Sequence, residues 1–253
     1  MIDSHAHLLS DELNAQQIIA GMQNDNLDYI INVGTDVSDS KQGIVLANNN
    51  EKIYTTVGIH PEYADTAAEK DLKIIEELAV QPKVVAIGEI GLDYHYGATS
   101  KQIEKQKWLF VSQIKLADKL KLPIVIHCRD AADDILQILK ANKQYLSNGF
   151  CMHCYSEGAK YIKEFLDLGA YISFTGNITY KKSDRSFLNQ IPQNKIMIET
   201  DCPYLSPEPL RGRVNQPKNV VHTAQKIADC LQISLQQFLS LTTQNSKTFF
   251  NIK

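Results

Sequence analysis

Side chains that bind metal ions or move protons recur along this chain, and they begin three residues from its start. In the stretch DSHAH, Asp3, His5 and His7 alternate with small residues. Because neighbouring side chains of a β-strand point to opposite faces, these three side chains would share one face of a strand. Histidine has no particular preference for strands, so propensity does not explain the pattern. A polar N-terminal tail would explain it equally well, and the rest of the chain must decide.

Similar residues close most of the later apolar segments of the chain. In order they are His60, Glu89 and Asp93, His127 and Arg129, His153, and Glu199 and Asp201. Imidazole with carboxylate suits zinc, manganese or a similar divalent ion, and magnesium where carboxylates and water dominate. Four histidines and two carboxylates from this set are more ligands than one tetrahedral metal site can take. They fit two ions that share a bridging carboxylate. Such a pair can activate a water and hold the attacking and leaving oxygens.

The segments that must position these residues are short, apolar and rich in β-branched residues. They cover residues 27–35, 52–60, 84–93, 123–128, 150–155, 170–176 and 195–204. Most are apolar almost throughout, which is typical of parallel strands covered on both faces. Helical patterns lie between them, the clearest over 101–121. Together with the first seven residues, they predict eight β-α units.

Eight such units in about 250 residues predict an α/β protein with a (β/α)8 TIM barrel. A doubly wound open sheet is the alternative, but it gives no reason for polar residues at nearly every strand end. In a barrel all these ends surround one mouth, where barrel enzymes keep their active sites.

Composition is that of an ordinary globular chain, with 253 residues of which 43% are hydrophobic. We expect a single domain over 1–253, because α/β barrels of this length are routinely one domain. No apolar run approaches the roughly 18 residues of a membrane span, and no signal peptide is evident. Five cysteines without export signals indicate a cytoplasmic protein. No obligate protein partner is evident, and a net charge of −3 requires any phosphate binding to be local.

Six motifs resemble those of the TatD family of metal-dependent deoxyribonucleases, in the same order and with the same spacing. They are DSHAH, GIHPE (58–62), GEIGLDYHY (88–96), PIVIHCRDA (123–131), ETDCPYL (199–205) and RGRVNQP (211–217). The resemblance implies a barrel of the metallo-dependent hydrolase type with two divalent cations. It implies His5, His7, Glu89 and Asp201 as ligands of one ion, and Glu89, His127 and His153 as ligands of the other. One departure is HCYSE after the sixth strand, where relatives more often have HCFSG.

Other residues have candidate roles around the metals. Asp3 and Asp93 would support the ligands from behind, and Asp201 could accept the proton of the attacking water, assisted by Glu199. The candidates for holding the substrate, mainly its phosphate groups, are His60, Arg129, Arg211 and Arg213, because a guanidinium matches phosphate oxygens.

We expect a deoxyribonuclease that hydrolyses phosphodiester bonds, from a strand end, with DNA or another phosphate-containing molecule as substrate. Metal-dependent cleavage of another ester or amide, such as aminoacyl-tRNA, is the alternative, and a non-catalytic metal- or nucleic-acid-binding protein is a third class. Glu89 favours the nuclease, because many amidohydrolases bridge their metals with a modified lysine at this strand. Cys151 and Cys154 form a C-x-x-C pair, but no second pair follows at zinc-ribbon spacing.

Overall fold

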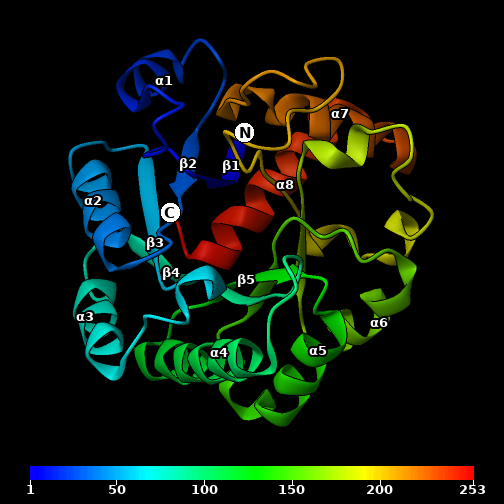
Figure 1. Cartoon of the computed structure of the whole chain (residues 1–253). Coiled ribbons are helices and arrows are strands. Elements are labelled where there is room, and N and C mark those ends of the chain that lie inside the picture. Colours follow the sequence, from blue (N-terminus) through cyan, green and yellow to red (C-terminus); the bar gives the residue numbers. More distant parts are fainter.

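The computed structural model describes residues 1–253, and its centre is one sheet of eight parallel strands joined in chain order (Figure 1). The strands are β1 (Ile2–Ala6), β2 (Tyr29–Asn32), β3 (Ile53–Val57), β4 (Val84–Asp93), β5 (Ile124–Arg129), β6 (Phe150–Met152), β7 (Tyr171–Phe174) and β8 (Ile196–Ile198). Every strand overlaps one of the predicted segments.

The sheet closes on itself where β1 meets the segment that follows β8. Ala6 pairs with Cys202 in a parallel bridge. The Asp201 N–H donates to the His5 carbonyl, and the His7 N–H donates to the Cys202 carbonyl, both at 2.9 Å. The predicted (β/α)8 barrel is therefore confirmed, and the carboxyl ends of all its strands surround one mouth.

Helices surround this barrel on the outside, except the last one, which runs across the centre of the view in Figure 1. They are α1 (Ala15–Gly21), α2 (Val37–Asn48), α3 (Glu69–Ala79), α4 (Ser100–Leu120), α5 (Ala132–Ala141), α6 (Ala159–Asp167), α7 (Val220–Leu231) and α8 (Leu235–Phe250). Helix α4 begins at a reciprocal cap, in which the Thr99 hydroxyl accepts the Gln102 N–H at 3.3 Å and the Gln102 side chain accepts the Thr99 N–H at 3.0 Å. This pairing satisfies donors that the first turn of a helix leaves free.

The connection between β7 and β8 departs from the regular alternation. It contains three short 3-10 helices, at Gly176–Thr179, Leu188–Gln190 and Gln193–Lys195, in place of an α-helix. The polar run KKSDRS at 181–186 offers no apolar stripe for packing on the sheet, and such a stripe is what holds the other helices there. This opens the chain into a long loop at the mouth.

Apolar residues fill two separate regions. The larger cluster lies between the sheet and the helices and includes Phe110 and Phe165. The smaller one, here called the barrel floor, joins residues of five strands to the end of α8, so it lies inside the barrel. Its members are Ile31, Val85, Ala86, Val125, Cys151, Met197, Phe249, Phe250 and Ile252. Phe249 and Phe250 pack against each other with ring centroids 4.8 Å apart and close this end of the barrel.

None of the helices combines the length and the apolar character that crossing a membrane would require.

Candidate metal centre

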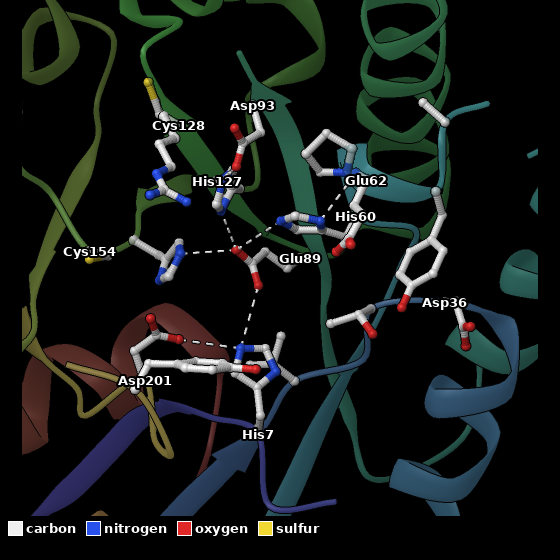
Figure 2. Close-up of a pocket in the computed structure, with 18 of the residues that line it drawn as sticks. His7, Asp36, His60, Glu62, Glu89, Asp93, His127, Cys128, Cys154 and Asp201 are labelled. Atoms are coloured by element: carbon white, nitrogen blue, oxygen red, sulfur yellow. Dashed lines mark hydrogen bonds and ion pairs between the residues drawn. The ribbon is translucent and has the colours of Figure 1, made fainter. Parts of the chain in front are cut away.

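A cavity of about 1090 Å³ opens at the mouth of the barrel. Its wall includes imidazoles and carboxylates from the ends of several strands, and Glu89 lies near the middle of them (Figure 2). Five of the six predicted metal ligands line this cavity; they are His7, Glu89, His127, His153 and Asp201. The sixth, His5, lies fully buried beneath them with Nε2 3.3 Å from a Glu89 oxygen. The fold therefore brings all six residues together.

Glu89 of β4 contacts histidines on two sides. Its Oε2 atom lies 3.3 Å from His5 Nε2 and 3.8 Å from His7 Nε2. Its Oε1 atom lies 2.6 Å from His127 Nδ1 and 2.9 Å from His153 Nε2. The carboxylate is only 3% exposed, so each oxygen is held within its own group of imidazoles.

Asp201 faces His5 of β1 and His7, which follows that strand, across the seam of the barrel. Its Oδ1 atom lies 3.2 Å from His7 Nε2 and 3.7 Å from His5 Nε2. The Asp201 backbone has a φ of 55°, a left-handed conformation that aspartate tolerates better than most residues. This turn directs the carboxylate toward β1.

Asp3 holds the residue before Asp201. Its two oxygens accept the N–H of Thr200 at 2.8 Å and the Thr200 hydroxyl at 2.5 Å. The sequence predicted Asp3 behind His5 and His7. Its direct contact with this pair is a 3.4 Å hydrogen bond from the His5 N–H. Complete burial raises the pKa of Asp3 to about 8, against the effect of these hydrogen bonds.

Asp93 lies at the end of β4 behind His127. Its Oδ2 atom is 3.0 Å from His127 Nε2, which leaves Nδ1 of the same ring directed at Glu89. Gln106 of α4 holds the Asp93 backbone at both ends, since its amide accepts the Asp93 N–H and donates to the Asp93 carbonyl, each at 2.9 Å. Asp93 therefore contacts His127, and a buried helix side chain fixes its backbone.

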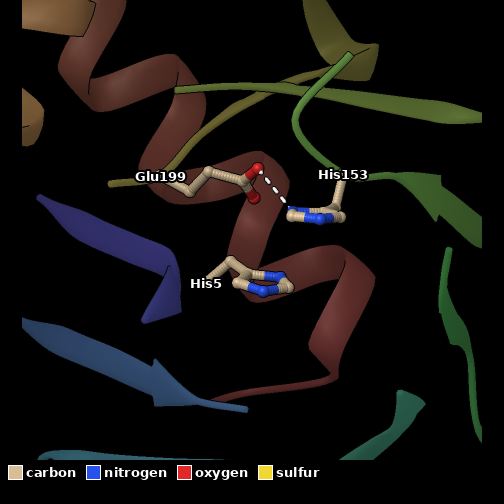
Figure 3. A group of neighbouring side chains, drawn as sticks. All are labelled: His5, His153 and Glu199. Atoms are coloured by element: carbon tan, nitrogen blue, oxygen red, sulfur yellow. Dashed lines mark hydrogen bonds and ion pairs between the residues drawn. The ribbon is translucent and has the colours of Figure 1, made fainter. Parts of the chain in front are cut away.

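Glu199 lies next to His153, on the side of the ring that carries Nδ1 (Figure 3). Its Oε1 atom lies 3.1 Å from His153 Nδ1 and accepts the Cys154 N–H at 2.7 Å. Its Oε2 atom accepts the Ser173 hydroxyl at 2.7 Å. Glu199 does not line the cavity, and these contacts occupy both its oxygens. The geometry gives it the task of orienting His153.

His60 also directs a ring nitrogen at the centre. Its Nε2 atom lies 3.7 Å from Glu89 Oε1, while its Nδ1 atom accepts the Glu62 N–H at 3.2 Å. Gln113 of α4 holds the preceding residue, because its amide bonds the N–H and carbonyl of Ile59 at 2.8 and 2.9 Å. The position permits contact with a substrate or with a metal ion.

The buried charges of the centre stabilise one another. Burial alone would raise the pKa of Glu89, yet His153, His5 and His127 hold that pKa well below its usual range. Burial would lower the pKa of His153, but Glu89 and Glu199 raise it well above the usual value. Burial lowers the pKa of His60 to about 4. Glu89 is thus ionised, and His153 carries a proton at neutral pH when no metal replaces it.

The residues fit divalent metal ions. Neither ring nitrogen of His5 makes a hydrogen bond, although the ring is fully buried and Nε2 faces two carboxylates. A buried polar atom without a partner is costly, and a metal ion would supply the missing one. Ligand atoms within 4.8 Å of one another occur in His5, His7 and Asp201, in His60, Glu89 and His127, and in His5, His153 and Glu199.

The three predicted arginines occupy different places. Arg129 lines the cavity, with its guanidinium carbon 5.4 Å from the centre of the Tyr96 ring. Arg211 stacks on Tyr180 at 4.3 Å and pairs with Glu208 at 4.0 Å. Neither Arg211 nor Arg213 lines the cavity.

Sequence reasoning missed Gln106 and Gln113. Both are buried in α4, where they continue the stripe formed by Leu109, Phe110 and Ala117. Two glutamines seven residues apart on an apolar face were the available signal.

The two cysteines of the C-x-x-C pair have different surroundings. Cys151 packs in the barrel floor, and Cys154 lines the cavity near the Thr175 hydroxyl.

Comparison with known proteins places this site in a family. Residues 2–251 match the family described as TatD related DNase. An uncharacterized metal-dependent hydrolase, YabD of Bacillus subtilis, is 36% identical over 100% of this chain and 99% of its own length. A 3'-5' ssDNA/RNA exonuclease, TatD of Klebsiella pneumoniae, is 30% identical over 100% of this chain and 98% of its own.

The fold comparison agrees. The crystal structure of YjjV, a TatD homologue from Escherichia coli, superposes with a TM-score of 0.91 at 26% identity, covering 100% of this chain and 98% of that one.

Proposed function

Because the chain belongs to the family of TatD-related DNases and is a metal-dependent hydrolase of that family, we propose that it hydrolyses DNA phosphodiester bonds from a strand end. The observation that carries this proposal is the position of Glu89, whose two oxygens face two separate groups of imidazoles. Such a carboxylate is suited to bridge two divalent ions, and two-ion sites are typical of nucleases and phosphatases.

The ligands divide between the two oxygens. We assign His5, His7, Asp201 and Glu89 Oε2 to one ion, and His127, His153 and Glu89 Oε1 to the other. Nitrogen and oxygen donors suit zinc, manganese and magnesium, in that order of preference for imidazole. When bound, these ions would activate a water and neutralise the phosphate oxygens.

Residues of the chain would accept the proton of the attacking water and orient the metal-binding histidines. Asp201 accepts the proton of the attacking water, because its carboxylate lines the cavity and is ionised: His7, His153 and His5 hold its pKa below the usual value despite burial. Glu199 and Asp93 hold the rings of His153 and His127 so that one nitrogen of each faces Glu89. In the reaction, the water oxygen bonds to phosphorus, the ester P–O bond breaks, and the leaving oxygen takes up the proton that Asp201 received and departs as an alcohol.

Arg129 is our candidate for binding a substrate phosphate within the cavity. Arg211 and Arg213, which lie outside the cavity wall, would meet a longer strand. His60, whose Nε2 atom lies 3.7 Å from Glu89 Oε1, would contact the reacting phosphate.

We also propose a cytoplasmic location, because all five cysteines are free, and unpaired cysteines are typical of a reducing compartment.

A panel of substrates tests the proposal. Purified protein would be incubated with single-stranded DNA, duplex DNA, RNA and an aminoacyl-tRNA, each with magnesium, manganese, zinc or EDTA. We expect nucleotide release from single-stranded DNA that EDTA abolishes and added metal restores, and that Glu89→Gln lacks. Cleavage of the aminoacyl ester with no phosphodiester hydrolysis under any metal would overturn the proposal and favour the esterase.

A further inference from the structure

The wall of the cavity carries its charges unevenly. Among its 32 residues, Arg129 is the only lysine or arginine, whereas seven are aspartate or glutamate. Four of these carboxylates lie outside the metal centre, and one of them, Asp65, is paired with Lys105 at 3.3 Å. The other three are called the acidic wall here; they are Asp36, Asp39 and Glu62.

Neutral groups fix the acidic wall without cancelling its charge. Asp36 accepts the N–H of Asp39 at 2.7 Å, as the cap of α2. Asp39 accepts the N–H and the hydroxyl of Thr35 at 2.9 and 3.0 Å. Since these donors carry no full charge, the carboxylates keep their negative potential toward the cavity.

Arg129 lies on the other side of the metal centre. Figure 2 shows Asp36 and Glu62 on one side of Glu89, and Cys128, the residue before Arg129, on the opposite side. A nucleic-acid strand that reaches the centre therefore meets a guanidinium on one side and three carboxylates on the other. Its phosphates are attracted to the first side and repelled by the second.

The acidic side also carries exposed aromatic side chains that could bind an uncharged nucleoside. Tyr63, which follows Glu62, is 37% exposed and lines the cavity. Tyr204, 56% exposed, lines it too, with its ring centroid 6.1 Å from that of His7. Exposed aromatic rings stack on bases, and carboxylates accept hydrogen bonds from sugar hydroxyls and base amino groups.

We propose that the acidic wall, Tyr63 and Tyr204 receive the one nucleoside beyond the scissile phosphate, while the rest of the strand leaves past Arg129. This inference rests on the proposed nuclease function and specifies its substrate class. The substrate is a strand whose released end carries a free hydroxyl and no phosphate.

The consequence is discrimination by end group. A terminal phosphate adds about −1.5 to −2 charges at pH 7, and it would lie among carboxylates. At the effective dielectric of a protein surface, one unit-charge repulsion at several ångströms lowers binding by roughly tenfold or more. A second nucleotide beyond the scissile bond would bring a phosphodiester to the same place. The wall therefore also favours release of single nucleotides.

The test uses four oligonucleotides of one sequence that carry hydroxyl or phosphate at the 3' end and at the 5' end. We expect a phosphate at the end from which nucleotides are released to lower kcat/KM by roughly 10- to 100-fold. The same group at the other end should change it less than about twofold. Equal rates for all four substrates would overturn the inference and leave the nuclease function standing. Absence of metal-dependent cleavage of every substrate would overturn the function and the inference with it.

A variant pair locates the effect. The double variant Asp36→Asn with Glu62→Gln removes two charges, while the asparagine side chain can still cap α2. It should cut the hydroxyl-ended substrate and lose most of the discrimination against phosphate. The control, Glu51→Gln with Asp167→Asn, changes the net charge equally near the amino ends of β3 and β7. It should retain the full discrimination. Unchanged discrimination in the first variant, or equal loss in both, would contradict the role of the acidic wall.

Discussion

The two ends of this barrel differ in the side chains that they bury: one end buries ionisable groups and the other buries apolar ones. The mouth buries ionisable groups, with Glu89, Glu199 and His5 at most 3% exposed. The floor, at the other end of the same strands, is an apolar cluster closed by Phe249 and Phe250. Within one strand the change is abrupt: Val125 belongs to the floor, and His127, on the same face two residues later, belongs to the metal centre.

This contrast separates stability from chemistry. Buried charges are costly even when paired, whereas each buried apolar side chain contributes about 1.5–3 kcal/mol. The floor and the layer beneath the helices therefore stabilise the fold. The mouth holds groups whose arrangement suits metal binding at the expense of stability. Changes at the mouth should impair function with little loss of stability, and changes at the floor should do the reverse.

The largest effect is expected at the mouth. Asp201→Asn should lower turnover by roughly 10²- to 10⁴-fold, because a neutral amide accepts no proton and is a weaker metal ligand. The melting temperature of the metal-free protein should change little, because His7 can release its own proton when its partner is neutral. Steady-state kinetics and thermal unfolding check this. Near-normal turnover together with normal unfolding would exclude the role of Asp201.

The matching change at the floor is Phe250→Ala. Phe250 is 2% exposed, and its truncation should cost about 3–5 kcal/mol of unfolding free energy. The melting temperature should fall by about 10 °C, while turnover well below that temperature stays within about twofold. Val45→Ala, at a side chain 61% exposed, is the control and should be nearly silent. A Phe250 variant that is folded yet inactive would break the separation between the two ends.

A smaller effect is expected at the contact between the metal centre and helix α4. Gln106→Leu keeps the volume of the side chain but removes both hydrogen bonds to the Asp93 backbone. Because Asp93 orients His127, metal affinity should fall by about 10- to 100-fold, measured by competition with a chelator. The exposed Gln225→Leu should leave the affinity unchanged. An affinity within twofold of the parent would make Gln106 a residue of structural importance only.

The last effect is a dependence of metal binding on pH. In the metal-free protein the pKa of His153 is well above its usual value, and those of His127 and His7 are also raised, despite burial, by nearby carboxylates. A metal ion must displace these protons. The apparent affinity for the metal should therefore rise with pH and level off once the pH exceeds the raised pKa values. The expected slope is about tenfold per pH unit for each proton released. Calorimetry in buffers of different ionisation enthalpy counts the protons, and zero release would contradict the charge assignment.

Much of the mouth could be predicted from the sequence because strand ends in a parallel barrel converge. Apolar segments located the strands, and polar residues at their ends, such as His5, Glu89 and His127, then had to meet. The barrel itself followed from the number of units. The connection between β7 and β8 was harder, because its 3-10 turns leave no periodic signal.

The sequence could not predict which of these side chains reach the cavity and which lie behind the metal ligands. Glu199 and Asp201 are two residues apart, and Glu199 was expected to assist Asp201, but β8 ends at Ile198 and Asp201 takes a left-handed turn. Alternation therefore fails there, and Glu199 lies behind His153 while Asp201 reaches the cavity. The contact of Asp3 with Thr200 joins the two ends of the barrel strand order, and that of Gln106 with Asp93 joins β4 to the helix that follows it. They depend on tertiary packing that no local pattern encodes.

The most direct test of the two-ion centre is anomalous scattering from crystals soaked in manganese or zinc. We predict two peaks on either side of the Glu89 carboxylate, one against His5, His7 and Asp201 and the other against His127 and His153. Glu89→Gln crystals soaked in the same way should lose at least one peak. A single ion held by Cys151 and Cys154, or no ion near Glu89, would contradict the account.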